Sequence, residues 1–162
     1  MCMYYVGIDA SLTGTAVVVL QDDKRVLTIT KQELTSTKPK DIIEDRFNQI
    51  LFKTVFITGM GDRVGAIYIE GLSFGSSGQS MLELAALHYM IRMQMYNTDT
   101  KYNVIPPTQL KKFVTGKGQS KKNLMLLQIY KKWGEEFSDD NIGDAYALAR
   151  MAYEENKNEN PV

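Results

Sequence analysis

The stretch YYVGIDASLTGTAVVVL, residues 4–20, joins two apolar runs through a short polar segment. The runs at residues 3–9 and 14–20 are rich in β-branched side chains, and the segment ASLTG between them contains residues typical of turns. The pattern therefore predicts two strands connected by a tight turn. Asp9 closes the first strand, where a buried carboxylate is costly unless it is paired or bound to a metal.

The rest of the chain alternates further strand patterns with helical ones. A third strand is expected in VLTITKQEL, residues 26–34, a fourth in VGAIYIEG, residues 64–71, and a fifth in KYNVI, residues 101–105. Apolar residues at helical spacing predict helices at 40–58, 80–96, 108–114, 121–133 and 144–153. The order β-β-β-α-β-α-β-α-α-α predicts an α/β domain with a mixed sheet flanked by helices.

Length and composition favour one domain in a reducing compartment. With 162 residues, 44% of them hydrophobic, the chain suits a single core, which we place at residues 1–153, followed by a polar tail at 154–162 that is expected to be disordered. Cys2 is the only cysteine and excludes a disulfide framework. The first residues lack a signal-peptide pattern and no apolar run could span a bilayer, so a cytoplasmic protein without a membrane partner is expected.

Charge is balanced overall but divided along the chain. The sequence has 19 basic and 19 acidic residues, yet the segment 101–133 contains eight lysines and no acid. This asymmetry predicts a basic surface beside an acidic site, and the alternative is an ordinary solvated lysine face on helices.

Acidic residues at three places in the chain stand out from this pattern. Asp9 and Glu70 each close an apolar strand and precede small residues, so on neighbouring strands they would meet at one sheet edge. Asp139, Asp140 and Asp144 fall at the start of the last helix, where acids also occur as caps. Converging carboxylates without a cation would repel one another, whereas Mg²⁺ prefers all-oxygen sites of this kind.

Four motifs resemble, in order and spacing, those of the RuvC family of Holliday junction resolvases, in particular a phage-encoded type. They are VGIDASLTGTAVVV, IYIEG, PPTQLKKFVTGKGQSKK and DDNIGDAYALARMA, and the resemblance spans residues 3–153. It implies an RNase H-like fold of the retroviral-integrase superfamily, with a five-stranded mixed sheet and helices on both faces.

The resemblance also implies a catalytic metal site. Asp9, Glu70 and Asp144 match three of the family's metal-binding acids, and Asp140 is expected as the fourth, with Asn141 as a weaker alternative ligand. Two Mg²⁺ ions about 4 Å apart would activate a water for attack on a phosphodiester, and Mn²⁺ should substitute for Mg²⁺. The expected activity is a structure-selective endodeoxyribonuclease that resolves Holliday junctions, and other branched DNA such as forks, flaps and three-way junctions, by paired nicks leaving 5′-phosphate and 3′-hydroxyl ends.

The lysine-rich segment fits the same activity. Lys111 and Lys122 align with two functional lysines of the family, which would hold the scissile phosphate or stabilise its developing charge. Further contacts to DNA phosphates are expected from Lys112, Lys117 and Lys121.

Three further features receive both a functional and a packing interpretation. Phe74 lies near the position of a family aromatic that unstacks bases, or else it folds back onto the core. The apolar helix at 80–96 would form the interface of a C₂ homodimer, although its methionines could also fill the core. His88 is expected to be a packing or interface residue and not a catalytic base.

Three other functions remain as alternatives. A binding module could recognise branched DNA without cutting it, and a ribonuclease H would act on RNA/DNA hybrids with the same fold. An actin-like or sugar-kinase ATPase also begins with GID followed by TGT, but that fold normally needs two such domains.

Overall fold

One mixed sheet of five strands forms the centre of the protein. The computed structural model describes residues 2–73 and 78–157. The sheet order is β3-β2-β1-β4-β5, in which β1, β2 and β3 are antiparallel neighbours while β4 and β5 run parallel to β1. The strands are β1 (Met3–Asp9), β2 (Gly14–Asp22), β3 (Leu27–Ser36), β4 (Val64–Glu70) and β5 (Asn103–Ile105). The expected five-stranded mixed sheet is confirmed.

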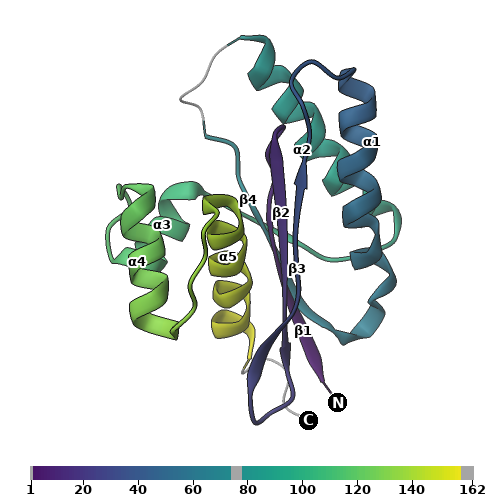
Figure 1. The fold of residues 1–162 in the computed structure, drawn as a ribbon. Coiled ribbons are helices and arrows are strands. Elements are labelled where there is room, and N and C mark those ends of the chain that lie inside the picture. Colours follow the sequence, from purple (N-terminus) through teal and green to yellow (C-terminus); the bar gives the residue numbers. More distant parts are fainter. Residues whose placement is uncertain (1, 74–77, 158–162) are drawn as a thin grey trace.

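Helices cover both faces of this sheet (Figure 1). They are α1 (Ile43–Thr54), α2 (Gln79–Asn97), α3 (Pro107–Thr115), α4 (Lys122–Trp133) and α5 (Asp140–Asn156). One hydrophobic cluster lies between the sheet and α1 and α2, and a second lies between the sheet and α3, α4 and α5. Within residues 2–73 and 78–157, no helix combines the length and the hydropathy that crossing a membrane requires.

The observed helix boundaries differ from the predicted ones by up to four residues, and two of these differences have an identifiable physical reason. The helix expected at 40–58 ends as α1 at Thr54 and continues as a 3₁₀ helix, Val55–Gly59, where β-branched residues and a glycine weaken the α-helical preference. At the other end of the chain α5 continues to Asn156, so residues 154–156 are helical and do not belong to a disordered tail. The reason is a tertiary anchor, because the Tyr68 hydroxyl donates to Glu155 and accepts from the Asn156 amide.

The alternation of side chains along β1 and β4 decides which face carries the acids. Tyr5 of β1 and Tyr68 of β4 pack in the cluster beneath α5, and residues two positions further along a strand share the same face. Asp9 and Glu70 therefore end their strands on the α5 face. Gly7 pairs with Tyr68 and Ile8 with Ile69 in the parallel register, which brings the two acids side by side.

Gly7 and the alanines of α5 allow this helix to approach the sheet closely. A Cβ on Gly7 would lie 1.9 Å from the Ala145 carbonyl oxygen and 2.5 Å from the Ala149 amide nitrogen, so no side chain fits there. Half of the buried residues of α5 are alanines, namely Ala145, Ala147, Ala149 and Ala152. The close approach sets the N-terminus of α5 against the ends of β1 and β4.

Candidate metal centre

Three carboxylates from three different elements meet at one edge of the sheet. Asp9 ends β1, Glu70 ends β4 and Asp144 lies in the second turn of α5, and one oxygen of each lies within 4.8 Å of the other two. Asp9 is only 6% exposed, while Glu70 and Asp144 are half-buried. The convergence of these three acids, inferred from the sequence, is present in the fold.

The environment of these acids favours their neutral forms as long as no cation is bound. Burial, followed by the charge of Glu70 and a hydrogen bond with it, raises the pKa of Asp9 well above its usual range. Burial also raises the pKa of Glu70. Burial and then the charge of Glu70 raise the pKa of Asp144 to about 7, while Lys122 acts in the opposite direction. A divalent cation would relieve both the desolvation and the repulsion, so an all-oxygen donor set of this kind suits Mg²⁺ or Mn²⁺.

The turn after Asp9 is held by a buried arginine that the sequence analysis did not single out. Arg46 of α1 is 5% exposed, and its guanidinium donates to the Leu12 carbonyl oxygen at 2.8 Å and to the Thr37 hydroxyl at 3.0 Å. Thr15 and Ser11 close the turn from inside with hydrogen bonds of 2.7 and 3.2 Å. A signal was available, because Arg46 lies on the apolar stripe of its helix.

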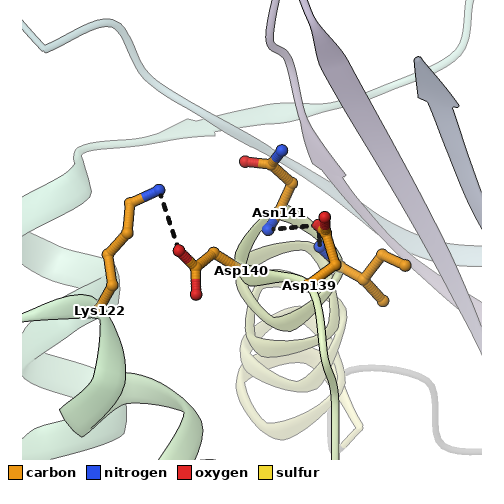
Figure 2. A network of polar contacts seen from close by, with 5 residues as sticks. Lys122, Asp139, Asp140 and Asn141 are labelled. Atoms are coloured by element: carbon orange, nitrogen blue, oxygen red, sulfur yellow. Dashed lines mark hydrogen bonds and ion pairs between the residues drawn. The ribbon is translucent and has the colours of Figure 1, made fainter.

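Three consecutive polar residues at the start of α5, Asp139, Asp140 and Asn141, make different contacts (Figure 2). Asp139 is the N-cap and accepts from the amides of Asn141 and Ile142 at 2.9 and 3.2 Å, so the capping interpretation is confirmed for this residue. Asp140 faces Lys122 across 3.5 Å, and both side chains are substantially exposed. Among the described residues Asp140 is outside the group that meets within 4.8 Å, although its charge contributes to the raised pKa of Asp144.

A cavity of about 240 Å³ lies over the carboxylates. Asn141 lines it, and a Cβ on Gly14 would lie 2.8 Å from the Asn141 side-chain nitrogen, so this amide reaches the start of β2. Lys111 of α3 and Lys122 of α4 line the same cavity. The two lysines therefore stand beside the three acids, as the functional interpretation requires.

The remaining predicted DNA contacts lie further out. Lys112 of α3, Lys117 of the following loop and Lys121 at the N-cap of α4 are exposed and do not line the cavity. The loop itself is ordered by Thr115, whose hydroxyl accepts from the Lys117 amide at 3.2 Å. Phe74, the predicted base wedge, lies outside the described residues.

His88 also lines the cavity, and its contact with β4 was not predicted from the sequence. It is 2% exposed and places Nε2 2.9 Å from the Glu70 carbonyl oxygen. Burial lowers the pKa of its imidazole, which favours the neutral ring. The packing role expected from the sequence is thus accompanied by a hydrogen bond to the end of β4.

Comparisons with known proteins agree with the fold and indicate a family. A family model described as "Crossover junction endodeoxyribonuclease RuvC" matches residues 5–151. A curated protein of that description from Sulfurovum sp. (strain NBC37-1) is 24% identical over 149 residues, which cover 91% of this chain and 92% of that protein.

Solved structures with a similar fold include RuvC of Thermus thermophilus, both by itself and in complex with a Holliday junction substrate. Each has a TM-score of 0.75, with 19% and 16% identity, over 94% of this chain and 96% and 95% of those chains. The fowlpox virus Holliday junction resolvase has a TM-score of 0.58 and 15% identity, over 94% of this chain and 99% of that one. The RNase H-like fold of the RuvC structures is therefore confirmed for this chain, and the phage-encoded type stays a prediction.

Proposed function

Since the chain belongs to the RuvC family of crossover junction endodeoxyribonucleases, it is a structure-selective nuclease, and we propose that it cleaves branched DNA with metal ions bound by Asp9, Glu70 and Asp144. The observation that carries this proposal is the approach of three carboxylate oxygens to within 4.8 Å of one another. Two of these acids end buried strands, so the sheet holds their main chains in place before any cation binds.

The cations are two Mg²⁺ ions in this proposal, and Mn²⁺ would replace them because it accepts the same oxygen donors. When bound, the ions would supply a water nucleophile at neutral pH and stabilise the leaving 3′ oxygen. The chain contributes fixed negative charge, a half-enclosed cavity and the two lysines that line it. Cleavage of this kind leaves 5′-phosphate and 3′-hydroxyl ends, which a ligase can join.

Asp140 is the proposed fourth ligand, and Asn141 is the weaker alternative. Asp140 precedes Asp144 by one helical turn and lies on the same face, but its carboxylate is turned toward Lys122 at 3.5 Å. This pair is exposed and therefore weak, so a cation could draw the carboxylate away at small cost. Asn141 already lines the cavity with a neutral oxygen donor.

The lysines have two different tasks in this proposal. Lys111 and Lys122 line the cavity and would neutralise charge that develops on the scissile phosphate. The exposed lysines at 112, 117 and 121 would bind neighbouring phosphates of the DNA arms, which positions the junction without reading its sequence. The base-unstacking role of Phe74 stays a prediction.

A homodimer would match the two-fold symmetry of a four-way junction, because two identical sites could nick opposing strands. The outer face of α2 supports this part of the proposal. While Leu87, Ile91 and Met95 are buried against the sheet, the opposite face exposes large apolar side chains, with Leu82 67% and Tyr96 74% exposed. The same face exposes Tyr89, Met90 and Met93. Contiguous apolar surface of this kind is typical of protein interfaces.

Cleavage of a synthetic four-way junction tests the proposal directly. Each strand is labelled in turn and incubated with the protein in Mg²⁺, in Mn²⁺ and in EDTA, beside linear duplex, forked DNA and an RNA/DNA hybrid. We expect metal-dependent, symmetric nicks in opposing strands of the junction, and none with Asp9→Asn.

Two other outcomes would contradict the proposal. Tight junction binding without cleavage in either metal would leave a branched-DNA binding module. Cleavage of the hybrid in preference to the junction would indicate a ribonuclease H.

A further inference from the structure

The peptide group between Glu70 and Gly71 is held on both of its polar atoms. The Gly71 amide donates to the Ile105 carbonyl oxygen of β5 at 2.7 Å, and the Glu70 carbonyl oxygen lies 2.9 Å from Nε2 of His88. These bonds come from a strand in the sheet and from α2, which covers the face opposite α5 (Figure 1). The peptide plane that follows the Glu70 side chain therefore has little freedom to rotate.

The room around Gly71 is equally restricted. A Cβ at this position would lie 3.3 Å from both the Ile105 carbonyl oxygen and Cγ1 of Val104. β4 thus ends pressed against β5. The hydrogen bond from His88 to the Glu70 carbonyl oxygen and the bond from the Gly71 amide to Ile105 together fix the backbone at and just past the last ladder pair, Glu70–Ile105.

The imidazole of His88 carries a cost that packing by itself does not explain. A carbonyl oxygen can only accept, so Nε2 carries the proton and, in the neutral ring, Nδ1 is left as an acceptor. In the part of the chain that the structure describes, Nδ1 is fully buried and has no hydrogen-bond partner. Buried polar atoms without partners are rare, and a leucine would fill this position without leaving one.

We propose that His88 is a positioning residue of the nuclease, which fixes the Glu70–Gly71 peptide and through it the Glu70 carboxylate. This inference rests on the proposed role of Glu70 as a metal ligand. The conformation of a carboxylate ligand follows from the main chain that carries it, and groups behind the ligands typically change metal affinity or activity by about 10–100-fold when they are removed. His88 acts through the backbone of Glu70 and does not itself touch the substrate.

Three substitutions separate positioning from simple packing. His88→Leu removes the donor and fills the space, and His88→Gln keeps an N–H donor. Ile91→Ala serves as the control, because Ile91 is fully buried on the same helix, one turn further along, and packs in the core away from the acids. Each variant is measured for Mn²⁺ affinity by calorimetry, junction binding in EDTA, single-turnover cleavage at saturating Mn²⁺, and thermal denaturation.

We expect His88→Leu to weaken Mn²⁺ binding by about tenfold or more and to slow cleavage by about 10–100-fold, with junction binding in EDTA unchanged. Its melting temperature should fall by less than that of Ile91→Ala, because the substitution also removes the unpartnered nitrogen. His88→Gln should recover part of the lost affinity. Ile91→Ala should lower the melting temperature and leave Mn²⁺ affinity unchanged.

Two results would overturn the inference. One is wild-type Mn²⁺ affinity and cleavage in His88→Leu. The other is a loss of Mn²⁺ affinity that is proportional to the fall in melting temperature, in the His88 variants and in Ile91→Ala alike. If His88→Leu does not fold, His88→Asn takes its place with the same expectations for Mn²⁺ affinity and cleavage, because its shorter side chain should not reach the Glu70 carbonyl oxygen.

A separate control tests the premise. Asp9→Asn must abolish Mn²⁺ binding. If it does not, the proposed metal centre fails, and the inference about His88 fails with it.

Discussion

Asp144 allows a quantitative test of the idea that this site is built for a cation and is unfavourable without one. Its pKa in the folded protein is about 7, against an ordinary value of 3.8, because of burial first and the charge of Glu70 second. The folded protein therefore binds the proton more tightly than the unfolded chain does. The stability from this group is fully present below about pH 4 and is lost as the pH rises through the folded value.

The size of the effect follows from the two pKa values. At pH 8 the Asp144 carboxyl group should cost the metal-free fold about 4 kcal/mol relative to a neutral side chain. At pH 5 the cost should be only about 1–2 kcal/mol, because the folded protein keeps the group protonated while the unfolded chain ionises it. Asp144→Asn removes the charge and keeps the shape. For a chain of this length each kcal/mol shifts the melting temperature by roughly 2–4 °C. We therefore expect the variant to melt about 10 °C above the wild type at pH 8 in EDTA, and only about 4 °C above it at pH 5.

The assay is thermal denaturation by circular dichroism at both pH values, in EDTA and again in Mg²⁺. Glu154→Gln is the matched control, because it removes one negative charge from the same helix at a half-buried surface pair with Arg150, whose loss should cost no more than about 1 kcal/mol. Mg²⁺ should raise the melting temperature of the wild type and hardly affect Asp144→Asn. The reasoning is refuted if Asp144→Asn melts at or below the wild type at pH 8, or if its advantage is equal at the two pH values.

Three other substitutions test the fold and the chemistry. Gly7→Ala would force a Cβ to 1.9 Å from the Ala145 carbonyl oxygen and should destabilise the protein by about 3 kcal/mol or more in urea denaturation, whereas Gly59→Ala, with nothing within 4 Å of the new Cβ, should be nearly neutral. Asp9→Asn should abolish cleavage but bind the junction in EDTA like the wild type in a gel-shift assay, and normal cleavage would show that the metal centre is misplaced. Lys111→Ala should slow single-turnover cleavage by about 10²-fold while junction affinity changes far less, and a loss confined to affinity would make Lys111 a phosphate anchor.

Local sequence patterns were sufficient to predict the strands and the placement of Asp9 and Glu70 at the ends of two of them. The β-branched runs on either side of ASLTG form β1 and β2. Because side chains alternate between the two faces of a strand, Asp9 and Glu70 both lie on the face of the sheet that α5 covers. The proposed fourth ligand is a different case. Asp140 and Asn141 are adjacent in sequence, and their directions depend on where α5 begins and on which residue caps it, so spacing by itself leaves both open.

Local sequence patterns could not predict contacts between residues that lie far apart in the sequence. The hydrogen bond from Arg46 to Leu12 spans 34 residues, and the one from His88 to Glu70 spans 18. Both acceptors are backbone carbonyl oxygens, so the residue types of Leu12 and Glu70 do not indicate these contacts. The end of α5 was misjudged for the same reason, because the composition of its last residues is polar while Tyr68, almost 90 residues earlier, holds them in place.

The sequence by itself determined the succession of strands and helices, because this follows from local periodicity, and the resemblance of its four motifs to a known family indicated the family and the candidate metal ligands. Tertiary structure decided how close the acids come, what pKa they have and what keeps their main chains fixed. These properties depend on the parallel register of β1 with β4 and on the close approach of α5 to Gly7, and each of them joins residues that are distant along the chain.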